Sequence, residues 1–243
     1  MRVLVVGLCL SVLLPALAVE EGFVSLFNGK DLSGWHGATD TYGVLPEEPG
    51  VLQCLPRIRD GREGNGGHLV TDREYRNFIL RFDFLMPTNG NNGVGIRMKD
   101  AIREAAYFGM CEVQLVDDNK SMLKETQLTG SIYGVVPPRH DNPVKDGYCR
   151  NGSYSRIPGL WNSEEVRVVG ETVEVTLNGV KIQSADLSKW KGDGDTVDGQ
   201  QHPGIHNKRG FIGWLGHGHN VKWRNIRIKE LPDDDLERPS TMD

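Results

Sequence analysis

The sequence predicts an all-β fold, built as a two-sheet sandwich or a barrel. Short runs of aliphatic, β-branched and aromatic residues recur along the chain, and glycine, proline and asparagine turns separate them. Helical periodicity is almost absent, since only 100–107 and 185–191 could form a helical turn or two. Many short antiparallel strands joined by tight turns can bury their apolar faces only in a sandwich or a closed barrel.

We expect ten strands in chain order. Asn178-Gly179 predicts a hairpin with a type I′ turn, because asparagine and glycine tolerate the positive φ angles that this turn needs. Gly170-Glu171 predicts a second tight connection, and the long segments 56–67, 137–158 and 192–208 predict functional or flexible loops. The strands are expected at Val51–Leu55, Leu69–Val70, Phe78–Met86, Gly93–Lys99, Cys111–Val116, Glu165–Val169, Thr172–Leu177, Lys181–Ser184, Arg209–Leu215 and Val221–Glu230.

The first residues predict an exported protein. Residues 1–18 combine one basic residue, a short apolar run and the ending Ala16-Leu17-Ala18, which is typical of a secretory signal peptide. The apolar run is too short for a membrane span, and no later run could cross a bilayer. We therefore expect a secreted or periplasmic protein with one domain over residues 22–231 and a disordered tail over 232–243.

Charge and cysteine content exclude several classes of partner. The formal net charge of −5 becomes −6 once Arg2 leaves with the signal, and basic clusters are absent, which argues against nucleic acid and anionic membranes. The mature chain keeps Cys54, Cys111 and Cys149. This odd count allows one disulfide with one free thiol, or none, and no pair has the spacing of zinc ligands.

The stretch CEVQLVDD, residues 111–118, carries the main candidate residues. It reads as a strand with Glu112 and Gln114 on one face and aliphatic residues on the other. The spacing of Glu112, Gln114 and Asp117 is similar to the Glu-x-Asp-x-x-Glu pattern of laminarinase-type retaining glucanases. Gln114 cannot ionise, and Asp117 faces the other way unless a bulge intervenes. The paired carboxylates of an ordinary retaining glycosidase are therefore poorly matched.

Other polar residues are candidates for contacts with a sugar. Arg97 alternates with aliphatic residues and could hold a ligand oxygen by charge-assisted hydrogen bonds, or it could pair with Glu112 without a catalytic role. Asn92 lies in a turn before that strand, Tyr133 stands close to two glycines where its phenol could reach a cleft, and His217 is flanked by glycines. Sugar-stacking candidates among the tryptophans are Trp35, Trp161 and Trp214, with Trp223 and Phe82 expected in the core. His202 and His206 have an i, i+4 spacing, but Pro203 and Gly204 favour a loop over a helical metal pair.

Six segments in order resemble one known family. They are GFVSLFNGKDLSGWHG, NNGVGIRMKD, CEVQLVDD, TGSIYGVVPP, LWNSEEVRVVGETVEVTLNGVKI and GFIGWLGHGHNVKWRNIRIKEL. The chain resembles the 3-keto-disaccharide hydrolase domain family over residues 22–231. The resemblance implies a concanavalin A-like, jelly-roll β-sandwich of two antiparallel sheets, and cleavage of glycosides already oxidised at C3. His217 matches the family histidine in a stretch that reads roughly Gln-Asp-His-Gly-Asp, but Leu215, Gly216 and His219 replace its neighbours here.

The chemistry of such a substrate defines the roles. A ketone at C3 acidifies the proton on C2, so a base can form an enolate, the aglycone leaves C1, and water adds back. We expect Glu112 as the base and His217 as the acid or second base. The remaining candidates would position the sugar or stabilise the enolate; they are Arg97, Gln114, Tyr133, Asn92 and Asp117.

Cofactor and partner expectations follow from the same chemistry. No cofactor is required by the sequence, and the absence of a Gly-x-Gly-x-x-Gly fingerprint speaks against a bound nicotinamide. A divalent metal could polarise the keto oxygen, with Glu112, Asp117 and His217 as available ligands. The partners implied are the carbohydrate substrate and an upstream sugar 3-oxidoreductase. Two alternatives stay open: a non-catalytic lectin-like module, and an ordinary glycoside hydrolase.

Overall fold

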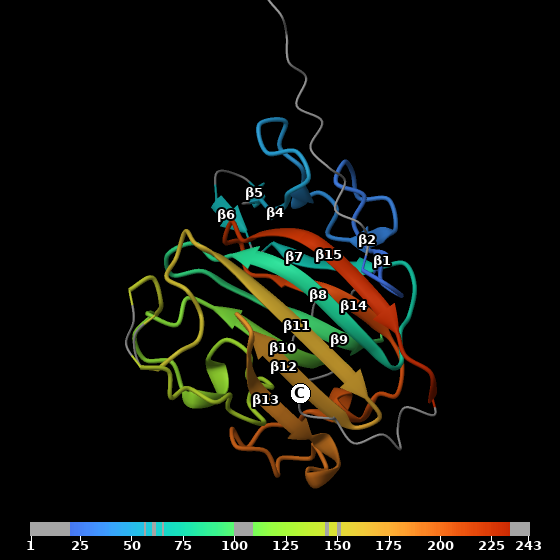
Figure 1. Cartoon of the computed structure of the whole chain (residues 1–243), viewed down its shortest axis with the longest axis vertical. Coiled ribbons are helices and arrows are strands. Elements are labelled where there is room, and N and C mark those ends of the chain that lie inside the picture. The colour runs from blue at the N-terminus through green and yellow to red at the C-terminus, as the bar shows by residue number, and fades with distance from the viewer. Residues whose placement is uncertain are drawn as a thin grey trace, which may run out of the picture.

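The computed structural model describes residues 20–55, 57–59, 62–64, 66–99, 109–143, 146–149 and 152–233, and within them the chain folds as two packed antiparallel sheets (Figure 1). This arrangement confirms the predicted β-sandwich. The larger sheet has the order β13 (Val180–Asp186), β12 (Thr172–Leu177), β11 (Trp161–Val169), β8 (Phe78–Leu85), β15 (Lys222–Glu230), β4 (Leu52–Cys54) and β3 (Tyr42–Gly43), and β1 (Val24–Ser25) also pairs with β15.

The second sheet carries the candidate residues. It has the order β10 (Cys111–Val116), β9 (Asn91–Met98), β14 (Phe211–Gly216), β7 (Gly67–Thr71) and β2 (Trp35–Gly37). A separate hairpin joins β5 (Arg57–Arg59) to β6 (Arg62–Gly64). Helical structure in the described residues is restricted to the 3₁₀ turns η1 (Glu125–Gln127), η2 (Leu187–Lys189) and η3 (Pro203–His206).

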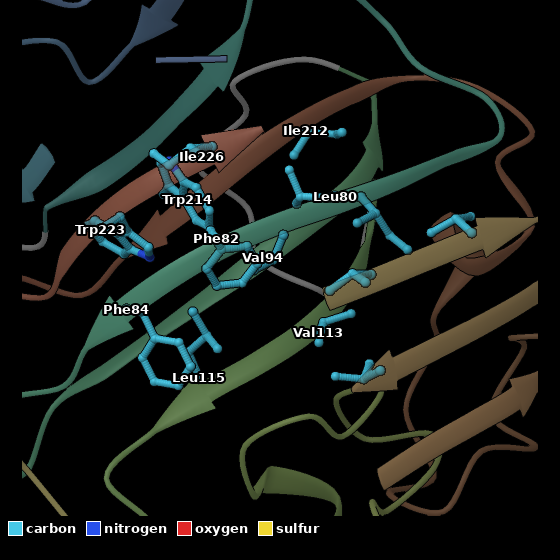
Figure 2. Packing of buried hydrophobic residues seen from close by; sticks show 14 of the residues in the cluster. Leu80, Phe82, Phe84, Val94, Val113, Leu115, Ile212, Trp214, Trp223 and Ile226 are labelled. Carbon is cyan, nitrogen blue, oxygen red and sulfur yellow. The ribbon is translucent and has the colours of Figure 1, made fainter. Parts of the chain in front are cut away.

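The core lies between the two sheets because alternate residues of each strand are apolar. In β8 every second residue is fully buried, starting from Phe78. Figure 2 shows these side chains meeting residues from the opposite sheet. Trp214 lies within this core, and the centroid of its ring is 5.0 Å from the ring centroids of both Phe82 and Trp223. Trp214 and Trp35 are therefore core residues and not sugar platforms, whereas Trp223 and Phe82 occupy the core as predicted.

Local turn chemistry also follows the sequence. Asn178 has φ 51° and Gly179 has φ 83°, and Leu177 pairs with Val180 across them, so the hairpin is confirmed. Val169 pairs with Thr172 around the second tight connection. Part of the expected helical stretch 185–191 forms η2. The expected signal peptide, the expected helical stretch 100–107 and most of the expected tail lie outside the described residues.

The three cysteines in the described part of the chain, Cys54, Cys111 and Cys149, are all buried free thiols. Of the two sequence alternatives, the structure therefore has no disulfide among the described residues. The described part of the chain contains no helix that is long and apolar enough to cross a membrane.

Candidate functional site

The outer face of the five-stranded sheet, the face turned away from the core, collects the candidate polar residues. In β10 the side chains of Val113 and Leu115 enter the core, so Glu112 and Gln114 project from the outer face. Their partners across the β9 ladder are glycines: Glu112 lies opposite Gly95, and Gln114 lies opposite Gly93.

These two glycines leave room above the sheet for the Glu112 side chain. A Cβ on Gly93 would overlap the Glu112 carboxylate, so the carboxylate leans over Gly93. The sulfur atoms of Met98 and Met110 lie over Gly95 in the same way. Both positions therefore require glycine, because other side chains pack directly over their backbone.

The apolar floor is a small cluster separate from the main core. It contains Val70, Met98, Met110 and Leu215, with Phe211 packed against it. Val70, Leu215 and Phe211 alternate with core residues of β7 and β14, and Met98 pairs with Phe211 after the irregularity in β9, which places this cluster on the outer face. The Glu112 carboxylate consequently borders side chains that cannot solvate a charge.

The electrostatics of Glu112 follow from this setting. The residue is only 7% exposed, and its carboxylate has no hydrogen bond or ion pair with a described residue. Burial alone raises the pKa of Glu112 to about 8. A carboxyl group with such a pKa is protonated about nine times in ten at pH 7, and its ionised form is a stronger base than an exposed carboxylate.

Two histidines lie on the same face, across the sheet from Glu112. His68 of β7 pairs with Leu215, and continuation of the β14 ladder places Leu215 beside Gly93. β10 and β7 are three strands apart in this sheet, so the backbones that carry Glu112 and His68 are separated by about 14 Å across the outer face. Both ring nitrogens of His68 are buried without a hydrogen-bond partner among the described residues.

His217 follows the end of β14 and stands at the rim near His68. Burial and the nearby His217 lower the pKa of His68. The His217 side chain is exposed, and partial desolvation by neighbouring atoms, together with His219 and Lys120, lowers the pKa of His217. Both imidazoles are therefore favoured in the neutral form at pH 7, in which one nitrogen accepts a proton and the other donates. His68 was not singled out from the sequence.

Tyr133 extends this face beyond the edge strand. Its backbone N–H donates to the carbonyl of Glu112 at 3.0 Å, and Ile132 bridges to Val113. Tyr133 therefore lies directly opposite Glu112 and shares its face, as residues opposed in an antiparallel ladder do. Gln127 donates to the Tyr133 hydroxyl at 3.1 Å and so orients the phenol.

Three expected sugar contacts lie elsewhere, which corrects the sequence interpretation. Arg97 is 3% exposed and donates to the carbonyls of Arg76, Gly170 and Asn207 at 2.6 to 3.1 Å, so its guanidinium holds loops together. Its φ of 52° marks an irregularity in β9, where the pairing with β14 shifts. The sequence alternation therefore does not carry Arg97 to the Glu112 face, and the ion pair considered with Glu112 is not formed.

Asn92 and Asp117 are also structural. Asn92 pairs with the core-facing Leu115 and is fully buried on the inner side of the sheet. The Asp117 carboxylate accepts from the backbone N–H groups of Asn89 and Asn119 at 2.8 and 3.0 Å, and so fixes the turn after β10. Neither side chain reaches the outer face where Glu112 lies.

The two spaced histidines and Trp161 do not join the site. His202 binds Asp198, and His206 binds Glu171, so the pair has separate partners. The guanidinium of Arg224 covers Trp161 at 4.1 Å from the ring centroid, on the outside of the larger sheet. Within the described ranges, no three His, Cys, Asp or Glu side chains come together as metal ligands, and dependence on a metal stays a prediction.

Comparison with known proteins identifies the family. The chain matches the family described as the 3-keto-alpha-glucoside-1,2-lyase-like domain over residues 22–229. It belongs to this family. A 3-keto-disaccharide hydrolase of Bacteroides thetaiotaomicron is 26% identical over 87% of this chain and 79% of the relative.

Two solved structures of proteins from Parabacteroides distasonis, both described as candidate glycosyl hydrolases, are similar to the fold of this chain. One is 28% identical with a TM-score of 0.66 and covers 86% of this chain and 99% of its own. The other is 26% identical with a TM-score of 0.68 and covers 87% and 95%, respectively. The sequence resemblance to the 3-keto-disaccharide hydrolase family is therefore confirmed.

Proposed function

We propose that this protein cleaves glycosides whose sugar carries a ketone at C3, with Glu112 as the general base. The observation that carries the proposal is the buried Glu112 carboxylate on the outer face, held against an apolar floor without a charged partner among the described residues. Membership of the family and the name of the Bacteroides relative support a carbohydrate of this class as the substrate.

The reaction needs no redox step within the protein. The Glu112 carboxylate removes the C2 proton, and the electron pair moves to form an enolate across C2 and C3. The ketone then reforms while a C1–C2 double bond is made and the C1–oxygen bond to the aglycone breaks. Water adds to C1, and C2 regains a proton. Because the substrate already contains the ketone, an upstream sugar 3-oxidoreductase must supply it.

The neutral histidines suit the other steps. A neutral imidazole such as His217 or His68 can donate a proton to the departing aglycone oxygen and can take one from the incoming water. The Tyr133 hydroxyl and Gln114 lie beside Glu112, where hydrogen bonds to the sugar would fix the C2 proton near the carboxylate.

A paired-carboxylate mechanism is less well supported. A retaining glycosidase places two carboxyl groups about 5 Å apart, and such a neighbour would contribute its charge to the pKa of Glu112. Among the described residues, burial is the only cause of the raised pKa of Glu112. Among the described residues, Glu112 therefore has no second carboxylate beside it, which fits elimination through an enolate better than double displacement.

The test uses purified mature protein with a 3-keto disaccharide and, separately, with its unoxidised parent. We expect cleavage of the keto substrate alone, and a loss of at least 100-fold in kcat/KM for Glu112→Gln. The matched control is Glu47→Gln, which changes an exposed glutamate distant in sequence from Glu112 and should retain full activity. Saturable binding without cleavage of either compound would instead identify a lectin-like module, the alternative favoured by the altered neighbours of His217.

A further inference from the structure

A polar hollow of about 150 Å³ lies at the edge of the outer face, and Tyr133 forms part of its wall. The other wall residues come from the segment around η1 and from the loop that precedes η3. Tyr133 is therefore shared between this hollow and the Glu112 region, because its other neighbour on the sheet is Glu112 itself. Its lining includes Lys124, Gln127, Tyr133, Gly134, Asp198 and Gln200.

Close contacts and hydrogen bonds fix the shape of the hollow. Gly134 has φ 74°, and a Cβ at this position would overlap both the Asp198 carboxylate and the His202 ring. The His202 ring is almost fully buried, and its Nε2 lies 3.0 and 3.1 Å from the two Asp198 oxygens. The Thr196 hydroxyl and the Gln200 backbone N–H also donate to Asp198 at 2.9 Å.

These contacts fix the position of the Asp198 carboxylate, a hydrogen-bond acceptor, and Lys124 and Gln200 offer donors in the same hollow. The hydrogen bonds to Asp198 lower the pKa of its carboxyl despite partial burial, so the group stays ionised at neutral pH. Lys124 and Gln200 have exposed side chains at the mouth of the hollow. A carboxylate, an ammonium group and amides in one small space can bind several hydroxyl groups at once, each as donor or acceptor.

The size of the hollow matches a small polar ligand. At about 30 Å³ for each water molecule, it holds about five waters, which is the scale of one sugar ring and not of an oligosaccharide. The named wall residues, apart from Gly134, all present polar groups, so the hollow suits a polar ligand.

We propose that this hollow binds the leaving sugar of a 3-keto disaccharide, and that Lys124, Asp198 and Gln200 make the protein prefer a sugar over an aryl group as aglycone. The inference rests on the proposed function, since it places the oxidised ring over Glu112 and the second ring past Tyr133. The Tyr133 phenol then lies at the junction of the two rings, close to the bond that breaks.

The experiment compares two substrates that share the oxidised ring. They are a 3-keto disaccharide with glucose as the leaving group and a 4-nitrophenyl 3-keto-glucoside. The double variant Lys124→Ala/Gln200→Ala removes two exposed side chains, and Lys30→Ala serves as the control for loss of an exposed lysine. We expect the double variant to lose about tenfold in kcat/KM on the disaccharide, mainly through KM, and to remain within about twofold on the aryl substrate.

An equal loss on both substrates, or no loss on either, would overturn the inference while leaving the proposed function intact. If the wild-type protein cleaves neither substrate, the proposed function fails, and a titration with free glucose followed by NMR still tests the hollow. Glucose binding by the wild-type protein that the double variant loses would then support the hollow as a sugar site. Glucose binding that both proteins share, or that both lack, would refute it.

Discussion

Replacement of Glu112 by glutamine should make the protein more stable at alkaline pH while it removes the base. The folded state raises the pKa of this carboxyl from 4.5 to about 8, so between these values the folded protein binds more protons than the unfolded chain. Stability then falls as pH rises from about 4.5 and levels off above about 8. At about 1.4 kcal/mol for each pKa unit, the full shift corresponds to about 5 kcal/mol, of which about 3 kcal/mol falls between pH 5 and pH 8.

Urea unfolding at pH 5 and pH 8 directly measures how much the titration of Glu112 contributes to the free energy of unfolding. Glutamine keeps the shape of the side chain and cannot ionise, so the stability of Glu112→Gln minus that of the wild type should grow by about 3 kcal/mol from pH 5 to pH 8. Other titrating groups occur in both proteins and cancel in the difference. A difference that stays constant with pH would show that Glu112 titrates normally, and would refute the desolvated base on which the mechanism depends.

Further predictions concern groups around the site and the core. Gly93→Ala adds a Cβ that overlaps the Glu112 carboxylate, so kcat/KM should fall at least tenfold at a cost of about 1–3 kcal/mol in urea unfolding; unchanged activity would contradict the packing. Arg97→Met leaves buried carbonyls unpaired and should lower stability by about 3 kcal/mol, yet keep kcat/KM of the folded protein within a few-fold; selective loss of kcat/KM would restore Arg97 to the site. Glu164 is 1% exposed, and both of its carboxylate oxygens lack a hydrogen-bond partner among the described residues. Burial and the nearby Asp118 raise the pKa of Glu164 well above 4.5, so Glu164→Gln should stabilise the protein more at pH 8 than at pH 5. An equal effect at both pH values would be inconsistent with that burial. Finally, kcat/KM should rise with pH up to about 8, the pKa of Glu112, and a profile flat from pH 6 to pH 8 would exclude it as the base.

Much of the fold could be predicted because it depends on local patterns. Alternating apolar residues and an Asn-Gly turn define the strands from β11 to β13 without knowledge of distant contacts. The short strands β1, β2 and β3 were not predicted, since two or three residues carry no period and form only by pairing with β15, β7 and β4. Trp214 shows the same limit, because an aromatic residue next to the glycine-rich rim looks the same in sequence whether it faces a sugar or the core.

The site was predictable where strand alternation holds. Glu112 and Gln114 share a face because β10 is regular, and Tyr133 joins them through a pairing that lies only twenty residues along the chain. Arg97 was misplaced because β9 turns irregular at that residue. His68 was missed because its place near His217 depends on the pairing of β7 with β14, over 140 residues away. A histidine that alternates with the apolar residues of a strand was the available signal.

In the proposed mechanism, Glu112 removes the proton on C2 of an oxidised sugar. The most direct measurement follows a 3-keto disaccharide and its unoxidised parent by mass spectrometry in deuterated water, with the wild type and Glu112→Gln side by side. We predict cleavage of the keto substrate alone, deuterium at C2 of the released 3-keto sugar, and loss of both in the variant if this mechanism is right. Cleavage of the unoxidised parent, or cleavage without deuterium at C2, would contradict it.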